Sequence, residues 1–305
     1  MAYSATDVKN LREQTGAGMM DCKKALDEVA GDFQKAVDYL RTKGLAAAAK
    51  KQSRVATEGM IAAAVSGKSA VVVEINSETD FASKSPDFVS FVTSTAKTAL
   101  ESKITTPDAL LSAKVGSTTV KDMISELTIK IGEKIDVRRV EAVTLTGNGV
   151  IGSYVHSGKI GVLVVLESDK DVSSNESVKE LAKDLCMHVA AASPQFLSGS
   201  EIDESFKARE AEVYAAQLKE QGKPEAMIPN IVKGKLAKLA SDVCLYEQAF
   251  VKDPDTTVAK LIETVGKTAG ATLKVTKFTK LVLGEGLQKK EDNFAEEVAK
   301  MTGHN

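Results

Sequence analysis

Few residues of this 305-residue chain have the types and spacing that enzymatic chemistry requires. The clearest pair is Asp184 and His188, which a helix would place one turn apart on one face. Such a pair can act as a general base or can form a structural hydrogen bond, and we expect the second. The sequence contains no Ser-His-Asp order, Walker loop, GxGxxG motif or cluster of metal ligands. We therefore expect no enzymatic activity, no cofactor and no bound metal.

The cysteines, Cys22, Cys186 and Cys244, are far apart and lack CxxC spacing, which argues against a disulfide framework or a zinc site. The formal net charge of −2 gives no overall attraction to nucleic acid or to a membrane surface. The first ten residues do not resemble a signal peptide, and no apolar stretch approaches the ~20 residues of a membrane span. We expect a cytoplasmic protein, with a mature organellar form as the alternative.

Residues 76–86, NSETDFASKSP, place an acid next to an aromatic residue, directly after an apolar run that is typical of a buried strand. Aromatic residues make up only 5% of the chain, so the position of Phe81 calls for a reason. One interpretation is that Phe81 packs on its own sheet and Asp80 caps the next turn. The other is that the strand end presents an acid and an apolar wedge to a partner.

The elements before this turn are helical. We expect three short helices in residues 4–44, with Thr6 as the first cap and Gly44 as the last C-cap. Met19 and Met20 are adjacent, so a helix cannot direct both side chains inward. One interpretation is a core Met beside an incidental surface Met. The other is an adaptable apolar contact beside Arg12.

Residues 45–59 are rich in alanine and then basic, with Lys50, Lys51 and Arg54 following Lys43. This segment could be a patch that contacts RNA or the ribosome. A solvated helical linker is the interpretation we favour, because no aromatic side chain is interleaved to stack on bases.

Two pairs of segments in the rest of the chain resemble each other. Residues 58–75 and 148–166 each read as a strand, a Ser-Gly-Lys turn and an apolar strand. Residues 118–145 and 256–283 each read as a helix followed by a strand with alternating apolar positions. The repeats predict an α+β fold that contains two related units, each an antiparallel sheet covered by helices.

The second unit has extra residues at about 198–247. They are polar and helix-forming, with Pro224 and Pro229 between two helical stretches. We expect a protruding helical hairpin. It is either a solvated excursion or an interaction arm, and its thin apolar faces favour the arm.

Six segments, in order along the chain, resemble translation elongation factor Ts. They are LREQTGAGMMDCKKAL (11–26), ETDFA (78–82), KIGEKIDVRRV (130–140), HSGKIGVLVVL (156–166), MHVAAASPQF (187–196) and GEGLQKK (284–290). The resemblance implies a ubiquitin-associated-like three-helix bundle, two related core subdomains, a helical coiled-coil insertion and a C-terminal helical module. The boundaries we expect for these parts are 1–55, 56–146, 147–284 with the insertion at about 198–247, and 285–305.

The resemblance also implies a function. Members of this family are guanine nucleotide exchange factors that bind the GDP form of elongation factor Tu, expel GDP and then yield to GTP. They catalyse no covalent change and hold no cofactor. The implied partner is elongation factor Tu in its GDP-bound and nucleotide-free states, without direct contact to nucleic acid or membrane. A homodimer through the helical insertion is a further possibility that the family raises.

Site residues follow from the same resemblance, position by position. The Asp-Phe pair of the family enters the GTP-binding domain of the partner near its Mg²⁺ site. The implied contacts are Thr79, Asp80, Phe81 and Ala82 for Mg²⁺ dislocation, Arg12, Met19 and Met20 on the first helices, His156 in the second unit, and the tail DNFAEEVAKM (292–301). The common family form has Cys and Val around the Asp-Phe pair, where this chain has Ser77 and Ala82. Both changes are small and should leave the pair intact.

Overall fold

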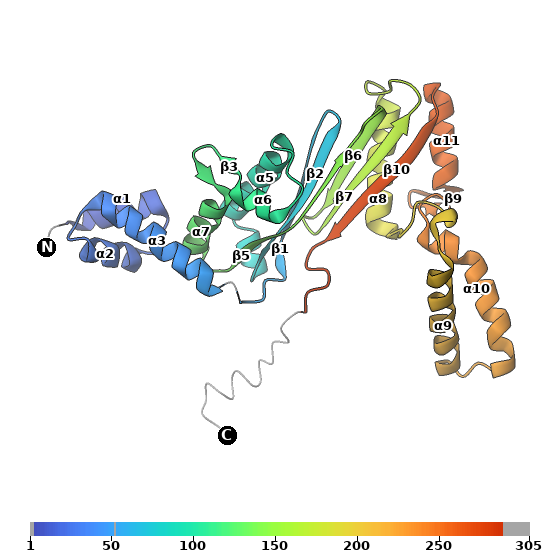
Figure 1. Cartoon of the computed structure of the whole chain (residues 1–305), viewed down its shortest axis with the longest axis horizontal. Coiled ribbons are helices and arrows are strands. Elements are labelled where there is room, and N and C mark those ends of the chain that lie inside the picture. The colour runs from blue at the N-terminus through green and yellow to red at the C-terminus, as the bar shows by residue number, and fades with distance from the viewer. Residues whose placement is uncertain (1–2, 52, 289–305) are drawn as a thin grey trace.

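The computed structural model of the chain describes residues 3–51 and 53–288. Its architecture is α+β, as the sequence predicts, with helices packed on two three-stranded antiparallel sheets. Figure 1 shows an elongated molecule, with the N-terminal helices at one end, the sheets side by side in the middle and a helical hairpin projecting at the other end. Most of the predicted C-terminal module, from residue 289 onward, lies outside the described residues, as does the tail at 292–301.

The N-terminal end consists of α1 (Ala5–Thr15), α2 (Met19–Glu28) and α3 (Phe33–Lys51). Ser4, rather than the predicted Thr6, caps α1. The Ser4 hydroxyl accepts a hydrogen bond from the Asp7 amide, and the Asp7 carboxylate accepts one from the Ser4 amide. This reciprocal capping box satisfies two amides that the helix itself leaves unpaired. The largest fully or almost fully buried side chains of the bundle are Leu11, Leu26 and Leu40.

Helix α3 does not end at Gly44, so the predicted C-cap is wrong. The helix continues to Lys51 and packs along α7 (Val120–Ile131). A Cβ atom on Gly44 would lie 2.0 Å from Cδ1 of Ile129, so the absence of a side chain at this position lets the two helices approach closely. The basic segment is therefore helical, as predicted, but it is packed on a neighbouring helix and is not a solvated linker. Its end is anchored by a hydrogen bond from the Lys51 ammonium to the Gly132 carbonyl.

The first sheet has the order β1-β2-β5. Its strands are β1 (Glu58–Ser66), β2 (Ser69–Ser77) and β5 (Ile135–Thr144). The other elements of this unit are α4 (Asp80–Ser83), α5 (Pro86–Glu101), α6 (Pro107–Ser112), α7 and the short strands β3 (Lys114–Val115) and β4 (Thr118–Thr119). Helices α5 and α7 share an apolar core with one face of the sheet.

The second sheet repeats this plan with the order β10-β7-β6. Its strands are β6 (Asn148–His156), β7 (Ile160–Ser168) and β10 (Leu273–Val282). Helices α8 (Glu176–Ala192) and α11 (Val258–Ala269) cover it, next to the short strands β8 (Ala249–Phe250) and β9 (Asp253–Thr257). The predicted helical hairpin is formed by α9 (Glu204–Glu220) and α10 (Ile228–Val243), with 3-10 turns at Gly199–Glu201 and Glu225–Met227. Figure 1 shows the hairpin projecting away from both sheets.

The two sheets face each other through a shared apolar layer, which explains why β2 and β7 are apolar at consecutive positions. The layer includes Ile61, Val72, Leu163 and Val165. The turn between β6 and β7 also contacts β1, because the Ile61 amide donates a 2.7 Å hydrogen bond to the carbonyl of Gly158. The relative position of the two units is thus fixed by packing and by backbone hydrogen bonds.

Gly161 lies where the sheets approach most closely, and we predict that Gly161→Ala destabilises the protein. The added Cβ would lie 2.4 Å from Cγ2 of Ile61 and 2.7 Å from Cγ2 of Val72. Both neighbours are β-branched and stiff, so overpacking should lower the free energy of unfolding by about 1–3 kcal/mol. Urea unfolding measures this, with Gly147→Ala as the control, since a Cβ there meets nothing within 4 Å. Equal losses for both variants would contradict close packing between the sheets.

A buried carboxylate joins the end of β10 to the first sheet. Glu74 on β2 is fully buried and accepts hydrogen bonds from Arg138 Nη1 at 2.9 Å, from Arg139 and from the amide of Gly284 at 2.8 Å. Burial raises the pKa of Glu74, but the hydrogen bonds from Gly284, Arg139 and Arg138 outweigh it and hold the pKa below its ordinary value. Arg139 also pairs with Glu285 at 3.0 Å. The GEG segment at 284–286 is therefore a structural anchor.

Candidate functional site

Phe81 is the most exposed large apolar side chain among the described residues, at 84% of its full accessibility. It lies in α4, close behind the end of β2. The interpretation in which Phe81 packs on its own sheet is therefore wrong. Burying such a ring against another surface is worth roughly 1.5–3 kcal/mol. The phenyl ring is thus available for contact with another macromolecule.

The turn that carries Phe81 is held by hydrogen bonds from both sides. Thr79, rather than the predicted Asp80, caps α4: its hydroxyl accepts a 3.2 Å hydrogen bond from the Ala82 amide. The Ser77 hydroxyl donates to the Thr79 carbonyl at 3.0 Å, and the Ser83 hydroxyl donates to the Asp80 carbonyl at 2.9 Å. Ala82 and Ser83 are buried. The exposed ring therefore projects from a backbone that is itself fixed.

Asp80 carries a charge that two lysines favour. Its carboxylate pairs with the Lys84 ammonium at 2.6 Å, and this hydrogen bond is the main reason that the pKa of Asp80 lies below its ordinary value. Lys159, from the turn between β6 and β7, also lowers the pKa of Asp80 through its charge. The second unit thus reaches the site, and at neutral pH the site presents a carboxylate beside an apolar ring.

His156 lies at the end of β6, at the start of the same β6–β7 turn, and is exposed. Its Nδ1 atom is 2.9 Å from the hydroxyl of Tyr154. This turn contacts β1, where Gly158 lies against Met60. The structure therefore places His156 on the part of the second unit that adjoins the first.

Met19 and Met20 are both exposed, at 46% and 74%, so the interpretation with one core Met is wrong. Arg12 is exposed in the last turn of α1. These residues belong to helices that pack on α3, and α3 in turn packs on α7. The structure therefore places an apolar and basic patch on the N-terminal helices, on a different part of the molecule from Phe81.

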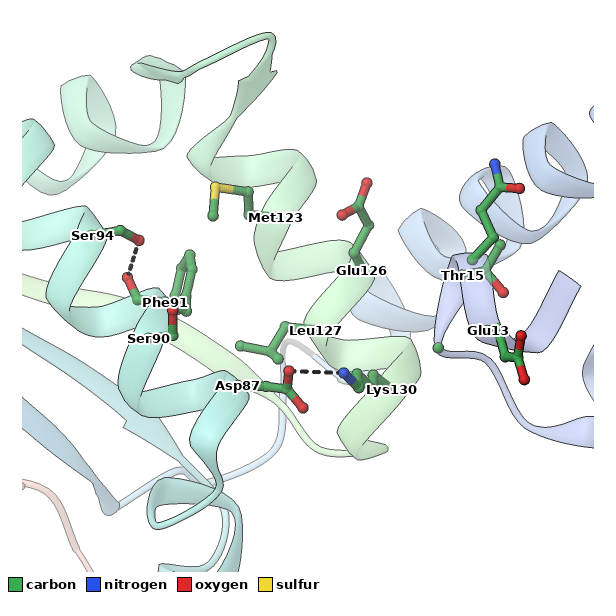
Figure 2. Close-up of a pocket in the computed structure, with 12 residues that line it drawn as sticks. Glu13, Thr15, Asp87, Ser90, Phe91, Ser94, Met123, Glu126, Leu127 and Lys130 are labelled. Atoms are coloured by element: carbon green, nitrogen blue, oxygen red, sulfur yellow. Dashed lines mark hydrogen bonds and ion pairs between the residues drawn. The ribbon is translucent and has the colours of Figure 1, made fainter. Parts of the chain in front are cut away.

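A cleft of about 330 Å³ separates the end of α1 from α5 and α7. Figure 2 shows Glu13 and Thr15 on one wall and the ion pair of Asp87 with Lys130 on the other. None of the residues predicted for the site lines this cleft. Its presence shows that the N-terminal helices are held to the rest of the molecule mainly by α3, while α1 stands apart from α5.

His188 and Asp184 do not form the expected hydrogen bond with each other. Asp184 pairs with the ammonium of Lys252 at 2.7 Å. His188 is fully buried, its Nε2 atom is 2.9 Å from Oε1 of Gln248, and its Nδ1 atom accepts a hydrogen bond from the Val251 amide at 3.3 Å. Because Nδ1 accepts, the ring proton lies on Nε2 and is donated to Gln248. His188 is therefore a neutral structural group that joins α8 to the segment after α10.

This arrangement predicts a pH dependence of stability. Burial lowers the pKa of His188 from its ordinary value of 6.5, because it disfavours the imidazolium. Below about pH 6.5 the unfolded chain binds a proton that the folded chain resists, so stability is present above this pH and lost as the pH falls. The slope should reach up to about 1.4 kcal/mol per pH unit.

Urea unfolding between pH 7 and pH 5 measures this slope. His188→Gln should flatten it, whereas the exposed control His156→Gln should leave it unchanged. A slope that persists in His188→Gln would show that other groups cause the acid sensitivity.

Two features that the sequence rules out can also be examined in the described residues. Among them, no group of three or more His, Cys, Asp or Glu side chains is placed to hold a metal ion. No helix in residues 3–51 and 53–288 has the length and apolar character that a membrane span needs. The three cysteines are buried and unpaired.

Sequence reasoning overlooked two glutamates that contact the Phe81 turn. Glu78 accepts a hydrogen bond from the Lys134 amide at 2.6 Å, and Glu133 accepts two from Thr79. Both glutamates belong to segments quoted for the family resemblance, which was the one signal available. Nothing in the local pattern shows that residues so far apart in sequence meet.

The fold and this site have the features of a protein-binding factor: an α+β scaffold with a rigid turn that exposes an acid and an aromatic side chain. Comparison with known proteins identifies the family. The family model described as elongation factor TS matches residues 78–285, more than half of the chain. Curated elongation factor Ts proteins of Clostridium perfringens and Trichlorobacter lovleyi are each 47% identical, over 98% and 99% of this chain and 99% of their own lengths. The chain belongs to the elongation factor Ts family, and so to the elongation factors of protein biosynthesis.

Proposed function

We propose that this protein is a guanine nucleotide exchange factor that binds elongation factor Tu in its GDP form and promotes GDP release, so that GTP can bind. Family membership supports the role and the partner. The structural observation that carries the proposal is the exposure of Phe81 on a turn whose backbone is fixed. An exchange factor of this kind acts by binding and forms no covalent bond.

The proposed mechanism uses the ring as a wedge. Phe81 enters the GTP-binding domain of the partner and separates packed groups that hold Mg²⁺ and the phosphates. Once Mg²⁺ is displaced, the phosphate charge is less well neutralised and GDP is held less tightly. The Asp80 carboxylate adds hydrogen bonds or repulsion near the same site. Since the exchange factor binds the nucleotide-free partner best, it must weaken nucleotide binding by the same factor by which nucleotide weakens its own binding.

Further contacts are part of the proposal. Thr79 and Ala82 complete the turn, and Arg12, Met19 and Met20 form a second contact with the GTP-binding domain. His156 contacts the distal β-domain of the partner, and the tail at 292–301 contacts the GTP-binding domain again. The corresponding functional parts are 1–55, 56–146, 147–284 and 285–305, in a cytoplasmic protein. Exposed apolar side chains on and next to the α9–α10 hairpin, such as Val213 and Met227, support self-association through this arm.

The RNA-binding alternative has less support from the structure. Of the four cations considered for it, Lys43 pairs with Asp21, Arg54 pairs with Glu78, and Lys51 donates to the Gly132 carbonyl. These contacts engage part of the charge that a phosphate backbone would need.

Stopped-flow release of a fluorescent GDP analogue from elongation factor Tu tests the function. Substoichiometric amounts of this protein should release all of the bound nucleotide, and the rate should rise with its concentration. If the protein does not accelerate release, and instead binds RNA with a steep salt dependence, the exchange proposal is wrong and the RNA-binding alternative takes its place.

A further inference from the structure

The turn between α7 and β5 contacts the turn that carries Phe81. Glu133, half-buried in this turn, accepts a hydrogen bond from the Thr79 amide on Oε2 at 2.9 Å and another from the Thr79 hydroxyl on Oε1 at 2.6 Å. Both carboxylate oxygens are therefore used on one residue. Hydrogen bonds to an ionised acceptor are among the stronger ones in proteins, and two in parallel also fix direction.

The hydroxyl of Thr79 connects this contact to the backbone that carries Phe81. It donates its only proton to Glu133, so its lone pairs remain for the Ala82 amide, which donates to it at 3.2 Å. Glu133 thus sets the orientation of the group that caps α4. A helix of this length has little stability of its own, so its geometry depends on the cap.

The two turns are linked a second time, in the opposite direction. The Lys134 amide donates to Oε1 of Glu78 at 2.6 Å, and Arg54 holds the same carboxylate at 3.2 Å. These neighbouring contacts keep the two turns side by side. The ring of Phe81 has no such restraint of its own, because it is 84% exposed.

We propose that Glu133 is a positioning residue for exchange: it holds the cap of α4 through Thr79 and so keeps Phe81 in the orientation that enters the partner. This inference rests on the proposed function. Glu133 touches neither nucleotide nor Mg²⁺ in this account. Its contribution is preorganisation, which lowers the cost of ordering Phe81 when the partner binds.

The first test needs no partner. The chain contains no Trp, so Phe81→Trp introduces a single reporter at the position in question. Time-resolved anisotropy of this Trp should show faster local motion when Glu133→Ala is added, and a smaller change with Glu133→Gln, which keeps one acceptor oxygen. Glu101→Ala is the matched control, since Glu101 makes only an exposed pair with Lys97 at 3.7 Å at the far end of α5. Local motion that is the same in all four proteins would overturn the proposal.

The second test measures exchange. Glu133→Ala should lower the maximal rate of GDP release from elongation factor Tu about tenfold, Glu133→Gln should lower it less, and Glu101→Ala should not change it. In a Phe81→Ala background, Glu133→Ala should add less than about twofold, because it acts through the ring. Equal effects in both backgrounds would assign Glu133 a purely structural role and contradict the inference. If the unmodified protein releases no GDP, the exchange function itself fails, while the anisotropy result still decides whether Glu133 orders the turn.

Discussion

Phe81→Ala is expected to lower the maximal rate of GDP release from elongation factor Tu by about 30-fold, equal to about 2 kcal/mol. The ring is 84% exposed in the free protein, so the substitution removes almost no internal packing. Stability should therefore stay within ~0.5 kcal/mol of the unmodified protein. The loss belongs to the complex, where a buried aromatic side chain at the centre of an interface typically dominates the binding energy.

A matched control separates the wedge from a general loss of apolar surface. Val89 on α5 is also exposed, at 37%, and Val89→Ala should leave the rate within about twofold. Phe81→Leu keeps part of the apolar volume and should fall between the two. If Phe81→Ala exchanges GDP at the unmodified rate, Phe81 is not the wedge, and the Met19 and Met20 patch becomes the leading candidate.

Glu74→Ala is expected to have the largest effect on folding, a loss of about 3–5 kcal/mol in the free energy of unfolding. The carboxylate is fully buried and is shared by Arg138, Arg139 and the amide of Gly284. Its removal leaves two guanidinium groups without their buried counter-charge. It also releases the end of β10 from the first sheet, so the joint between the two units should weaken.

Urea unfolding measures the loss, with Glu141→Ala as the control. Glu141 is an exposed glutamate on β5, opposite Val72 of β2, and its removal should change the free energy of unfolding by no more than ~0.5 kcal/mol. Similar losses for the two variants would mean that the buried cluster contributes no more than a surface charge.

Much of the fold can be predicted from the sequence because its signals are local. The two hairpins show a turn between apolar strands, and the helical hairpin of α9 and α10 shows helix-forming residues around two prolines. Gly44 shows the limit of such reasoning. A glycine near the end of a helical pattern reads as a C-cap, and only its contact with Ile129 shows why the helix continues.

The site is predictable to a lesser degree. The Asp80–Phe81 pair stands out by residue type, but its exposure depends on how β2 is covered on both faces, which no local pattern states. The capping partner of Thr79 is Glu133, 54 positions away, and the partner of His188 is Gln248, 60 positions away. Contacts over such separations are set by the tertiary fold, so the expected Asp184–His188 bond was the local but wrong choice.

The most direct test of the central claim compares the unmodified protein with the Asp80→Ala, Phe81→Ala double variant, in stopped-flow GDP release from elongation factor Tu with and without Mg²⁺. If the pair acts by disturbing the Mg²⁺ and phosphate site, the unmodified protein should be much faster than the variant with Mg²⁺ present. Most of this difference should vanish once a chelator has removed the ion. An equal difference under both conditions would contradict the mechanism, and no difference with Mg²⁺ present would contradict the role of the pair itself.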